Sequence, residues 1–300
     1  MNYILYNPKS NSENNDLNII PGKAELEKRG TKQINLLEVV LREFLDTLTD
    51  SDKVYLCGGD GTLHHFANNA RGFSFPCPVY VIRSGTGNDF LNDIGQTDPN
   101  TLFDVREHIA NLPEVEIDGK KQLFINGVGM GIDGEVCAGV EEYKKKTGKK
   151  ANYTAIALKL LAYKYKRPSA TVTIDGVTHH FNNVWMAGAM HGRYFGGGMM
   201  VAPMQDRTTG KMNVMVMHGG TRAKILTIFP LIFKGGHVKH KDIVEIFECD
   251  EVTVTFDIPI GFQADGEVTP KMTTYTARSA NLVKRLEEEK NSALAGVTEE

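Results

Sequence analysis

The chain has 300 residues, about twice the length of one typical domain, so a single small binding module is excluded. Hydrophobic residues make up 41% and charged residues 24% of the sequence, which excludes wholesale disorder. The 34 Lys and Arg nearly balance the 37 Asp and Glu, and this net charge of −3 argues against a protein that coats nucleic acid.

The first hundred residues alternate short apolar runs with helical patterns. Strands are predicted at Tyr3–Tyr6, Lys53–Cys57 and Val79–Ile82. Helices are predicted over residues 34–48, where six apolar residues recur at helical spacing, and over Thr62–Ala70. A glycine-rich loop follows the second and the third strand. Strand, glycine loop and helix in repetition indicate a parallel α/β domain with its working loops at the carboxyl ends of the strands.

The second half of the chain follows a different pattern. Residues alternate between apolar and polar along several short segments, and Asp175-Gly176 supplies a hairpin turn after one of them. These strands are predicted at Ala170–Ile174, Met212–Val216 and Val252–Phe256, and two helices at Asn152–Tyr165 and Thr221–Phe233. Short alternating strands with tight turns predict an antiparallel sandwich.

We therefore predict a two-domain protein, an α/β domain with a parallel sheet at 1–115 followed by a β-sandwich domain at 116–285. Residues 286–300 are charged and then small and polar, which favours a frayed tail.

The cysteines and the apolar runs give an expectation about the compartment. The four cysteines form neither a disulfide framework nor a zinc pattern, which favours a reducing environment. The start of the chain does not resemble a signal peptide, and the longest apolar stretch, Ile225–Phe233, is far shorter than the ~20 residues that span a bilayer. We expect a cytoplasmic protein for which transient membrane contact stays open.

The glycine loop Gly58–Thr62 lies between a predicted strand and a predicted helix. Glycines allow close approach of the backbone to an anion, and the amides of a helix N-terminus favour phosphate there. Asp60 within this loop would repel phosphates unless a divalent cation or a proton intervenes. The G-x-x-x-x-G-K-[ST] phosphate loop does not occur in the sequence, and a dinucleotide-binding G-x-G-x-x-G pattern is weak.

Several motifs resemble one known family in the same order along the chain. Gly58–Thr62 and Ser84–Phe90 resemble the catalytic domain of diacylglycerol kinases, a lipid kinase family that also includes sphingoid-base kinases. Further segments resemble its bacterial branch: Phe124–Val136, Gly196–Pro203, Phe233–His237 and Phe262–Glu267. The resemblance runs from about Tyr3 to Val268.

The resemblance implies that ATP and Mg²⁺ are used to phosphorylate a hydroxyl of a diacylglycerol-like or related lipid. Residues 1–115 would bind the nucleotide and residues 116–285 the acceptor. Nucleotide contacts are implied for Asn7, Pro8, Lys9, Gly58, Gly59, Asp60, Gly61, Thr62, Gly85, Thr86 and Asn88. Mg²⁺ would be organised by Asp60 and Asp89. Asp206 is the candidate for a second metal site, in which Thr209 replaces the usual Asp.

The carboxylate motif near the end of the chain carries the implied catalytic chemistry. Glu267 matches the proposed general base, which takes the proton from the attacking lipid hydroxyl, and Asp265 is expected to act beside it. If the chain is extended here, alternate residues share a face, so that one carboxylate faces the metal and the other the substrate.

Departures from the family pattern keep other functions open. Asn11 stands where the family has glycine in its first loop. A kinase of a soluble alcohol and a nucleotide-binding regulator without catalysis are the alternatives. The basic residues Lys144–Lys150 are interpreted as a solvated loop rather than a contact with anionic lipid. The identity of the acceptor and the oligomeric state are not predicted.

Overall fold

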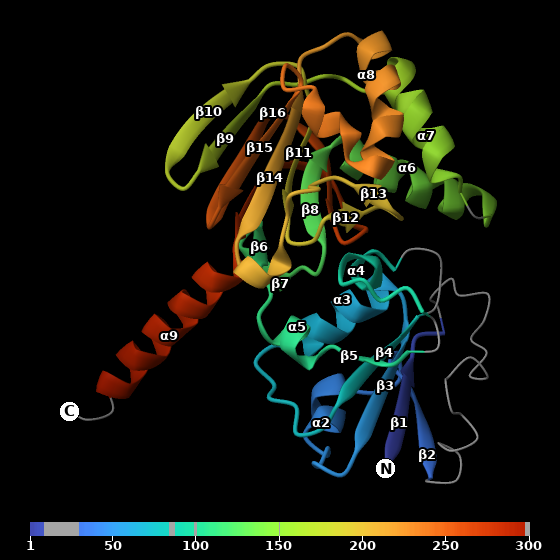
Figure 1. Ribbon diagram of the computed structural model, residues 1–300, viewed down its shortest axis with the longest axis vertical. Coiled ribbons are helices and arrows are strands. Elements are labelled where there is room, and N and C mark those ends of the chain that lie inside the picture. The colour runs from blue at the N-terminus through green and yellow to red at the C-terminus, as the bar shows by residue number, and fades with distance from the viewer. Residues whose placement is uncertain (9–29, 84–87, 99–100, 150, 298–300) are drawn as a thin grey trace. The chain divides into compact units, whose positions relative to one another are not determined.

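The computed structural model describes residues 1–8, 30–83, 88–98, 101–149 and 151–297 (Figure 1). The chain forms two compact units. The first unit consists of Met1–Leu112 together with Gly196–Gly198, and the second of Pro113–Phe195 and Met199–Glu300. The glycine segment is thus counted with the first unit although its neighbours in the chain belong to the second.

The first unit is built on a five-stranded sheet of order β2-β1-β3-β4-β5. Its strands are β1 (Asn2–Tyr6), β2 (Thr31–Asn35), β3 (Lys53–Gly58), β4 (Val79–Arg83) and β5 (Phe103–Asp104). The first four strands pair in parallel and β5 pairs antiparallel to β4. This mostly parallel sheet confirms the predicted α/β class of the N-terminal part.

Four helices accompany this sheet in the described residues: α2 (Leu41–Leu45), α3 (Asp60–Asn69), α4 (Asp89–Asp93) and α5 (Arg106–Ala110). The helix predicted over residues 34–48 is wrong in its first part, because Ile34 lies in β2 opposite Leu5. Pairing with a buried strand thus overrides the helical spacing of the apolar residues. Only Leu41–Leu45 of that stretch is helical.

The second unit is built on a ten-stranded antiparallel sheet of order β15-β14-β11-β8-β16-β17-β6-β7, in which β9 pairs with β16 and carries β10. The strands are β6 (Glu114–Ile117), β7 (Lys120–Leu123), β8 (Gly127–Gly131), β9 (Ala170–Ile174), β10 (Val177–Phe181), β11 (Val184–Met190), β14 (Met212–His218), β15 (Val244–Cys249), β16 (Glu251–Ala264) and β17 (Glu267–Arg278). A small separate pair joins β12 (Tyr194–Phe195) to β13 (Met199–Met200). The predicted antiparallel class is confirmed.

The helical elements of the second unit are α6 (Ile132–Thr147), α7 (Tyr153–Lys159), η2 (Leu160–Lys164), η3 (Arg207–Thr209), α8 (Arg222–Ile228), η4 (Phe229–Lys234), η5 (Gly236–Lys239) and α9 (Ala280–Val297). Figure 1 shows α6, α7 and α8 grouped together beside the sheet. None of the helices in the described ranges is long and apolar enough to cross a membrane.

Two segments predicted as irregular are helical. Lys144, Lys145 and Lys146 form the last turn of α6 rather than a loop, where cations complement the helix dipole. Lys145 and Lys146 also form ion pairs with glutamates one turn earlier, at 3.3 and 2.5 Å. Instead of a frayed tail from residue 286, α9 continues to Val297, since Leu, Glu, Lys and Ala are strong helix formers.

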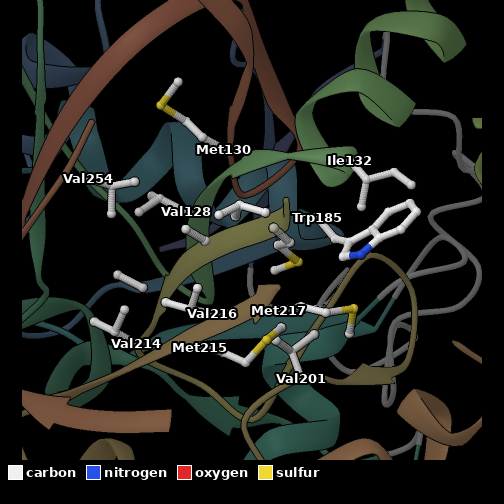
Figure 2. Close-up of a cluster of buried hydrophobic side chains, with 14 of the residues drawn as sticks. Val128, Met130, Ile132, Trp185, Val201, Val214, Met215, Val216, Met217 and Val254 are labelled. Atoms are coloured by element: carbon white, nitrogen blue, oxygen red, sulfur yellow. The ribbon is translucent and has the colours of Figure 1, made fainter. Parts of the chain in front are cut away.

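One large cluster of buried hydrophobic side chains forms the core of the second unit. Figure 2 shows Val128, Met130, Val214, Val216 and Val254 from neighbouring strands packed together, with Trp185 at one side. Each of these six side chains is fully buried. This core fixes the ends of β8 and β16, from which the carboxylates and glycines of the sequence motifs project.

Candidate functional site

The first glycine motif forms a one-residue connection between strand and helix. β3 ends at Gly58, Gly59 caps the N-terminus of α3, and the helix begins at Asp60, two residues earlier than predicted. The amides of Thr62 and Leu63 donate to the Gly59 carbonyl at 3.0 and 3.1 Å. A Cβ on Gly58 would overlap the buried Thr62 side chain, so this pair requires glycine at position 58.

One side of this turn is open. A Cβ on Gly61 would meet no atom within 4 Å, so the backbone is accessible there. The amides of the first helical turn carry the positive end of the helix dipole, which favours an anion. The predicted phosphate contact of Gly58–Thr62 is therefore compatible with the local geometry.

The Asp60 carboxylate connects this turn to the next predicted loop. Its two oxygens accept hydrogen bonds from the amides of Asp89 and Phe90, at 2.8 and 3.0 Å. These are the first amides of α4, whose own N-cap residue, Asn88, has a left-handed φ of 56° and makes no side-chain cap. Asp60, at the start of α3, therefore caps the N-terminus of α4.

The Asp89 carboxylate continues this connection to the triple glycine. It is 3% exposed, and its oxygens accept hydrogen bonds from the amides of Gly197 and Gly198 at 2.8 and 2.7 Å. Gly196, Gly197 and Gly198 all have positive φ angles, 67°, 83° and 101°, which favour glycine. The sequence offers no signal for this contact, because it joins residues more than one hundred positions apart.

Of the remaining residues predicted to contact the nucleotide, the structure describes only some. Asn7 and Pro8 directly follow β1, at the carboxyl edge of the sheet where β3 and β4 also end. Lys9, Gly85 and Thr86 lie outside the described residues.

The predicted metal ligands come from both units. Asp60 and Asp89 belong to the first unit and Asp206 to the second. No group of three or more His, Cys, Asp or Glu side chains within the described ranges is arranged to hold a metal ion.

Asp206 caps the short helix η3. Its Oδ1 accepts hydrogen bonds from the amide and the hydroxyl of Thr208, at 2.9 and 2.7 Å. The hydroxyl bond, followed by the amide bond, lowers the pKa of Asp206. The Thr209 hydroxyl, at the position of the missing Asp, donates to the Asp206 carbonyl at 2.9 Å. The segment is thus held by its own side chains.

Asp265 lies in a hairpin turn rather than an extended chain. Asp265 and Gly266 connect β16 to β17 and have φ angles of 47° and 90°, as in a two-residue type I′ turn. The expectation that Asp265 and Glu267 share one face of an extended chain is therefore wrong. The sequence Asp-Gly between two apolar runs is a hairpin signal of the same kind as Asp175-Gly176.

The Asp265 carboxylate anchors the motif that precedes β8. It accepts hydrogen bonds from the amides of Ile125, Asn126 and Gly127, at 2.6, 2.8 and 3.1 Å. In return the Asp265 amide donates to the Gly127 carbonyl at 3.0 Å. The structural role of this side chain is therefore to join two sequence motifs 138 to 140 positions apart.

Arg207 also contacts residues 125–127. The sequence did not indicate this arginine as part of the site. Its guanidinium donates to the Ile125 carbonyl at 3.2 Å and to the buried side chain of Asn126 at 3.3 Å. The Asn126 carbonyl also accepts from the amides of His191 and Gly192. Three distant segments thus converge on residues 125–127, and the side chain of Asn126 is fixed among them.

Glu267 differs from Asp265 in its surroundings. It is the first residue of β17, it is exposed, and its carboxylate forms no hydrogen bond or ion pair with the described residues. A carboxylate in this state has its lone pairs free to accept a proton.

Asp133 is the buried acid of the glycine-rich motif that resembles the family. It lies in the first turn of α6 and is 7% exposed, with Gln263 donating to its Oδ2 at 3.3 Å. Its Oδ1 has no hydrogen-bond partner in the described part of the chain. Burial raises the pKa of Asp133 to about 6, and the nearby Glu135 contributes in the same direction.

We expect Asp133→Asn to stabilise the second unit at alkaline pH. A carboxyl whose pKa is higher in the folded than in the unfolded state loses stability as the pH rises through about 6, because ionisation then opposes burial. The variant should gain on the order of 2 to 3 kcal/mol in the free energy of unfolding at pH 8, and under about 1 kcal/mol at pH 4.

Urea unfolding followed by the fluorescence of Trp185, the single tryptophan, measures this difference within the second unit. Asp118→Asn is the matched control, since Asp118 is exposed and its φ of 48° also suits Asn. An equal gain at both pH values would contradict the burial argument.

Comparisons with known proteins agree with the two-unit arrangement. Residues 2–117 match the diacylglycerol kinase catalytic domain, and residues 126–283 match the YegS C-terminal NAD kinase beta sandwich-like domain. A diacylglycerol kinase of Mycobacterium tuberculosis (strain ATCC 25618 / H37Rv) is 26% identical over 226 residues, 72% of this chain and 71% of that protein. The "Putative lipid kinase YtlR" of Bacillus subtilis (strain 168) is 21% identical over 234 residues, 72% and 74% of the two chains.

The same fold occurs in a crystal structure of a diacylglycerol kinase from Bacillus anthracis str. Sterne. That structure has a TM-score of 0.59 and 16% identity, covering 93% of this chain and 94% of the other. The second domain match alone spans more than half of this chain. The chain therefore belongs to the bacterial lipid kinase family in which a diacylglycerol kinase catalytic domain is followed by a YegS C-terminal domain.

Proposed function

We propose that this protein is a lipid kinase that transfers the γ-phosphate of ATP to a hydroxyl of a diacylglycerol-like or related lipid. The main support for the proposal is the order of the sequence motifs along the chain. The Gly58–Thr62 turn lies within the diacylglycerol kinase match, and Asp265-Gly266-Glu267 lies within the YegS C-terminal match.

In this proposal residues 1–115 bind the nucleotide. The backbone of Gly58–Thr62 holds phosphates, with Asn7, Pro8 and Asn88 near the same strand ends. Residues Lys9, Gly85 and Thr86 keep the nucleotide contacts that the resemblance implies. Asp60 and Asp89 would supply carboxylate oxygens for Mg²⁺ or its waters, since Mg²⁺ prefers oxygen ligands.

Residues 116–285 hold the acceptor in this proposal, and Glu267 is its general base. The acceptor oxygen forms a bond to the γ-phosphorus while the bond from that phosphorus to the β,γ-bridging oxygen breaks. The hydroxyl proton passes to the Glu267 carboxylate, and ADP leaves. Phosphoryl transfer depends mainly on positioning and charge neutralisation, so a single carboxylate suffices as the protein's proton acceptor.

Asp265 has a different role from the one expected beside Glu267. Its oxygens hold the backbone of residues 125–127, so we propose that it positions the turn that presents Glu267 rather than contacting the reacting atoms. Asp206 is proposed as the cap of η3, because its Oδ1 accepts from the amide and the hydroxyl of Thr208.

The form of the acceptor tests the proposal against its nearest alternative. ADP release should rise when diacylglycerol is supplied in detergent micelles and stay at the background rate with glycerol, which carries the same hydroxyl without acyl chains. The reverse preference would instead identify a kinase of a soluble alcohol. Binding of ATP without turnover on either acceptor would identify a nucleotide-binding regulator.

A further inference from the structure

The segment that contains η3 is the place where the resemblance implies a second metal site. We call residues 205–211 the η3 loop, in which Thr209 stands where an Asp is implied. A hard divalent cation such as Mg²⁺ takes oxygen ligands, namely carboxylates, backbone carbonyls and waters. The partners of the oxygens in the η3 loop therefore show whether the loop is built for a cation.

Protein donors are bonded to the backbone carbonyls of the η3 loop. The side-chain amide of Asn281 donates to the Thr209 carbonyl at 2.8 Å, and the backbone amide of Asn281 donates to the Gly210 carbonyl at 3.1 Å. The side-chain amide of Gln205 donates to the Lys211 carbonyl at 3.0 Å. Three successive carbonyls thus face N–H groups, which carry the partial positive charge that a cation would otherwise supply.

The Thr209 side chain is also bonded within the loop. Its hydroxyl donates to the Asp206 carbonyl at 2.9 Å and accepts from the amide of Lys211 at 3.2 Å. An ionised aspartate at position 209 could not make the first of these bonds, because it has no proton to donate. The threonine therefore closes the loop with a hydrogen bond of its own.

The Asn281 side chain fills the space over the η3 loop. Gly210 follows Thr209, is buried, and has a φ of 70°. A Cβ on Gly210 would overlap the side chain of Asn281, so the asparagine lies directly against the loop backbone. The loop, the glycine and the asparagine thus fit one another without a further group between them.

The charges of the η3 loop also oppose a divalent cation. Asp206 is its one acidic residue, whereas Arg207 and Lys211 are basic. The bonds from Thr208 lower the pKa of Asp206, and the charge of Arg193 contributes to a smaller extent. A guanidinium near enough to act on this carboxylate would repel a cation that approached it.

We propose that the Asn281 side chain takes the place of a metal ion at the η3 loop and holds the start of α9 against it. Asn281 lies in the first turn of α9, and its amide connects that turn to a residue 72 positions earlier. The loop is closed by amide and hydroxyl donors, so the stability of the second unit does not depend on divalent cations. This role of Asn281 is independent of the proposed function.

Unfolding with and without a divalent cation tests the first part of the proposal. Urea unfolding of the full chain is followed by Trp185 fluorescence in millimolar Mg²⁺ or in EDTA at the same ionic strength. We expect the same unfolding midpoint in both solutions. A higher midpoint in Mg²⁺ that disappears in Asp206→Asn would overturn the proposal, because the asparagine keeps the helix cap but not the charge of a metal ligand.

Replacement of Asn281 tests the second part of the proposal. Asn281→Ala leaves the Thr209 carbonyl without its donor from α9. It should raise the unfolding equilibrium constant about fivefold relative to Asn291→Ala, which corresponds to one net hydrogen bond. Asn291 is the matched control, since it is an exposed asparagine of the same helix. Equal constants for the two variants would overturn the role of Asn281.

A double variant tests whether the amide and a cation occupy the same place. Thr209→Asp/Asn281→Ala adds a carboxylate to the η3 loop and removes the amide that faces it. Its unfolding midpoint should be higher in Mg²⁺ than in EDTA, because a cation that binds only the folded state stabilises it. Asn281→Ala alone should lack this shift. The same midpoint of the double variant in both solutions would contradict the replacement of a metal ion by Asn281.

Discussion

Glu267→Gln should lower the turnover of lipid phosphorylation by about 10² to 10⁴-fold while ATP still binds with unchanged affinity. Glutamine has the shape of glutamate but cannot take the proton of the attacking hydroxyl. Because Glu267 is exposed and its side chain forms no hydrogen bond or ion pair with the described residues, the free energy of unfolding should change by less than about 0.5 kcal/mol.

Steady-state kinetics with a micellar lipid acceptor, together with calorimetric ATP titration, measures both quantities. Glu289→Gln, at an exposed position of α9, is the matched control and should have wild-type kinetics. Full turnover by Glu267→Gln would remove the general-base assignment.

Asp265→Ala should destabilise the second unit by about 3 to 6 kcal/mol. The substitution leaves the amides of Ile125, Asn126 and Gly127 without their acceptor, and each buried donor that loses its partner costs about 1 to 3 kcal/mol. Alanine is also disfavoured at a φ of 47°, which adds to the loss. Such a change is a large part of the stability of a typical domain.

Asp265→Asn is the matched control for this prediction. Asparagine tolerates the left-handed turn and keeps one oxygen as an acceptor, so roughly 1 to 2 kcal/mol should be lost. Urea unfolding followed by Trp185 fluorescence gives both values in the unit that contains Asp265. Equal stability of Asp265→Ala and the wild type would contradict the anchoring role.

The architecture was largely predictable because both halves of the chain show the periodicity of their elements. Strand β9 has the predicted bounds, and β3 and β4 differ from prediction by one residue at one end. The helix α6 was not predicted, since two glycines and a run of lysines obscure its pattern. Gly134 is nevertheless required in it, because a Cβ there would overlap the backbone of Gly261 on β16.

The candidate site was predictable in its residue types and less so in their contacts. The Gly58–Thr62 turn follows from a strand, glycines and a helix that are adjacent in sequence. The carboxylates of Asp60, Asp89 and Asp265 instead bond to amides 29 to 140 positions away, and no local pattern encodes such partners. Motif resemblance therefore indicated which carboxylates are candidates for the site. Only the folded backbone shows that Asp60, Asp89 and Asp265 accept hydrogen bonds from loop amides, whereas Glu267 does not.

The central claim is tested most directly by transfer of the labelled γ-phosphate of ATP to lipid. The protein is incubated with mixed micelles that contain diacylglycerol, with and without Mg²⁺, and the lipid is extracted and counted. We expect labelled lipid that depends on Mg²⁺ and is nearly absent with Glu267→Gln. No labelled lipid under any of these conditions, with ATP binding retained, would contradict the assignment of this protein as a lipid kinase.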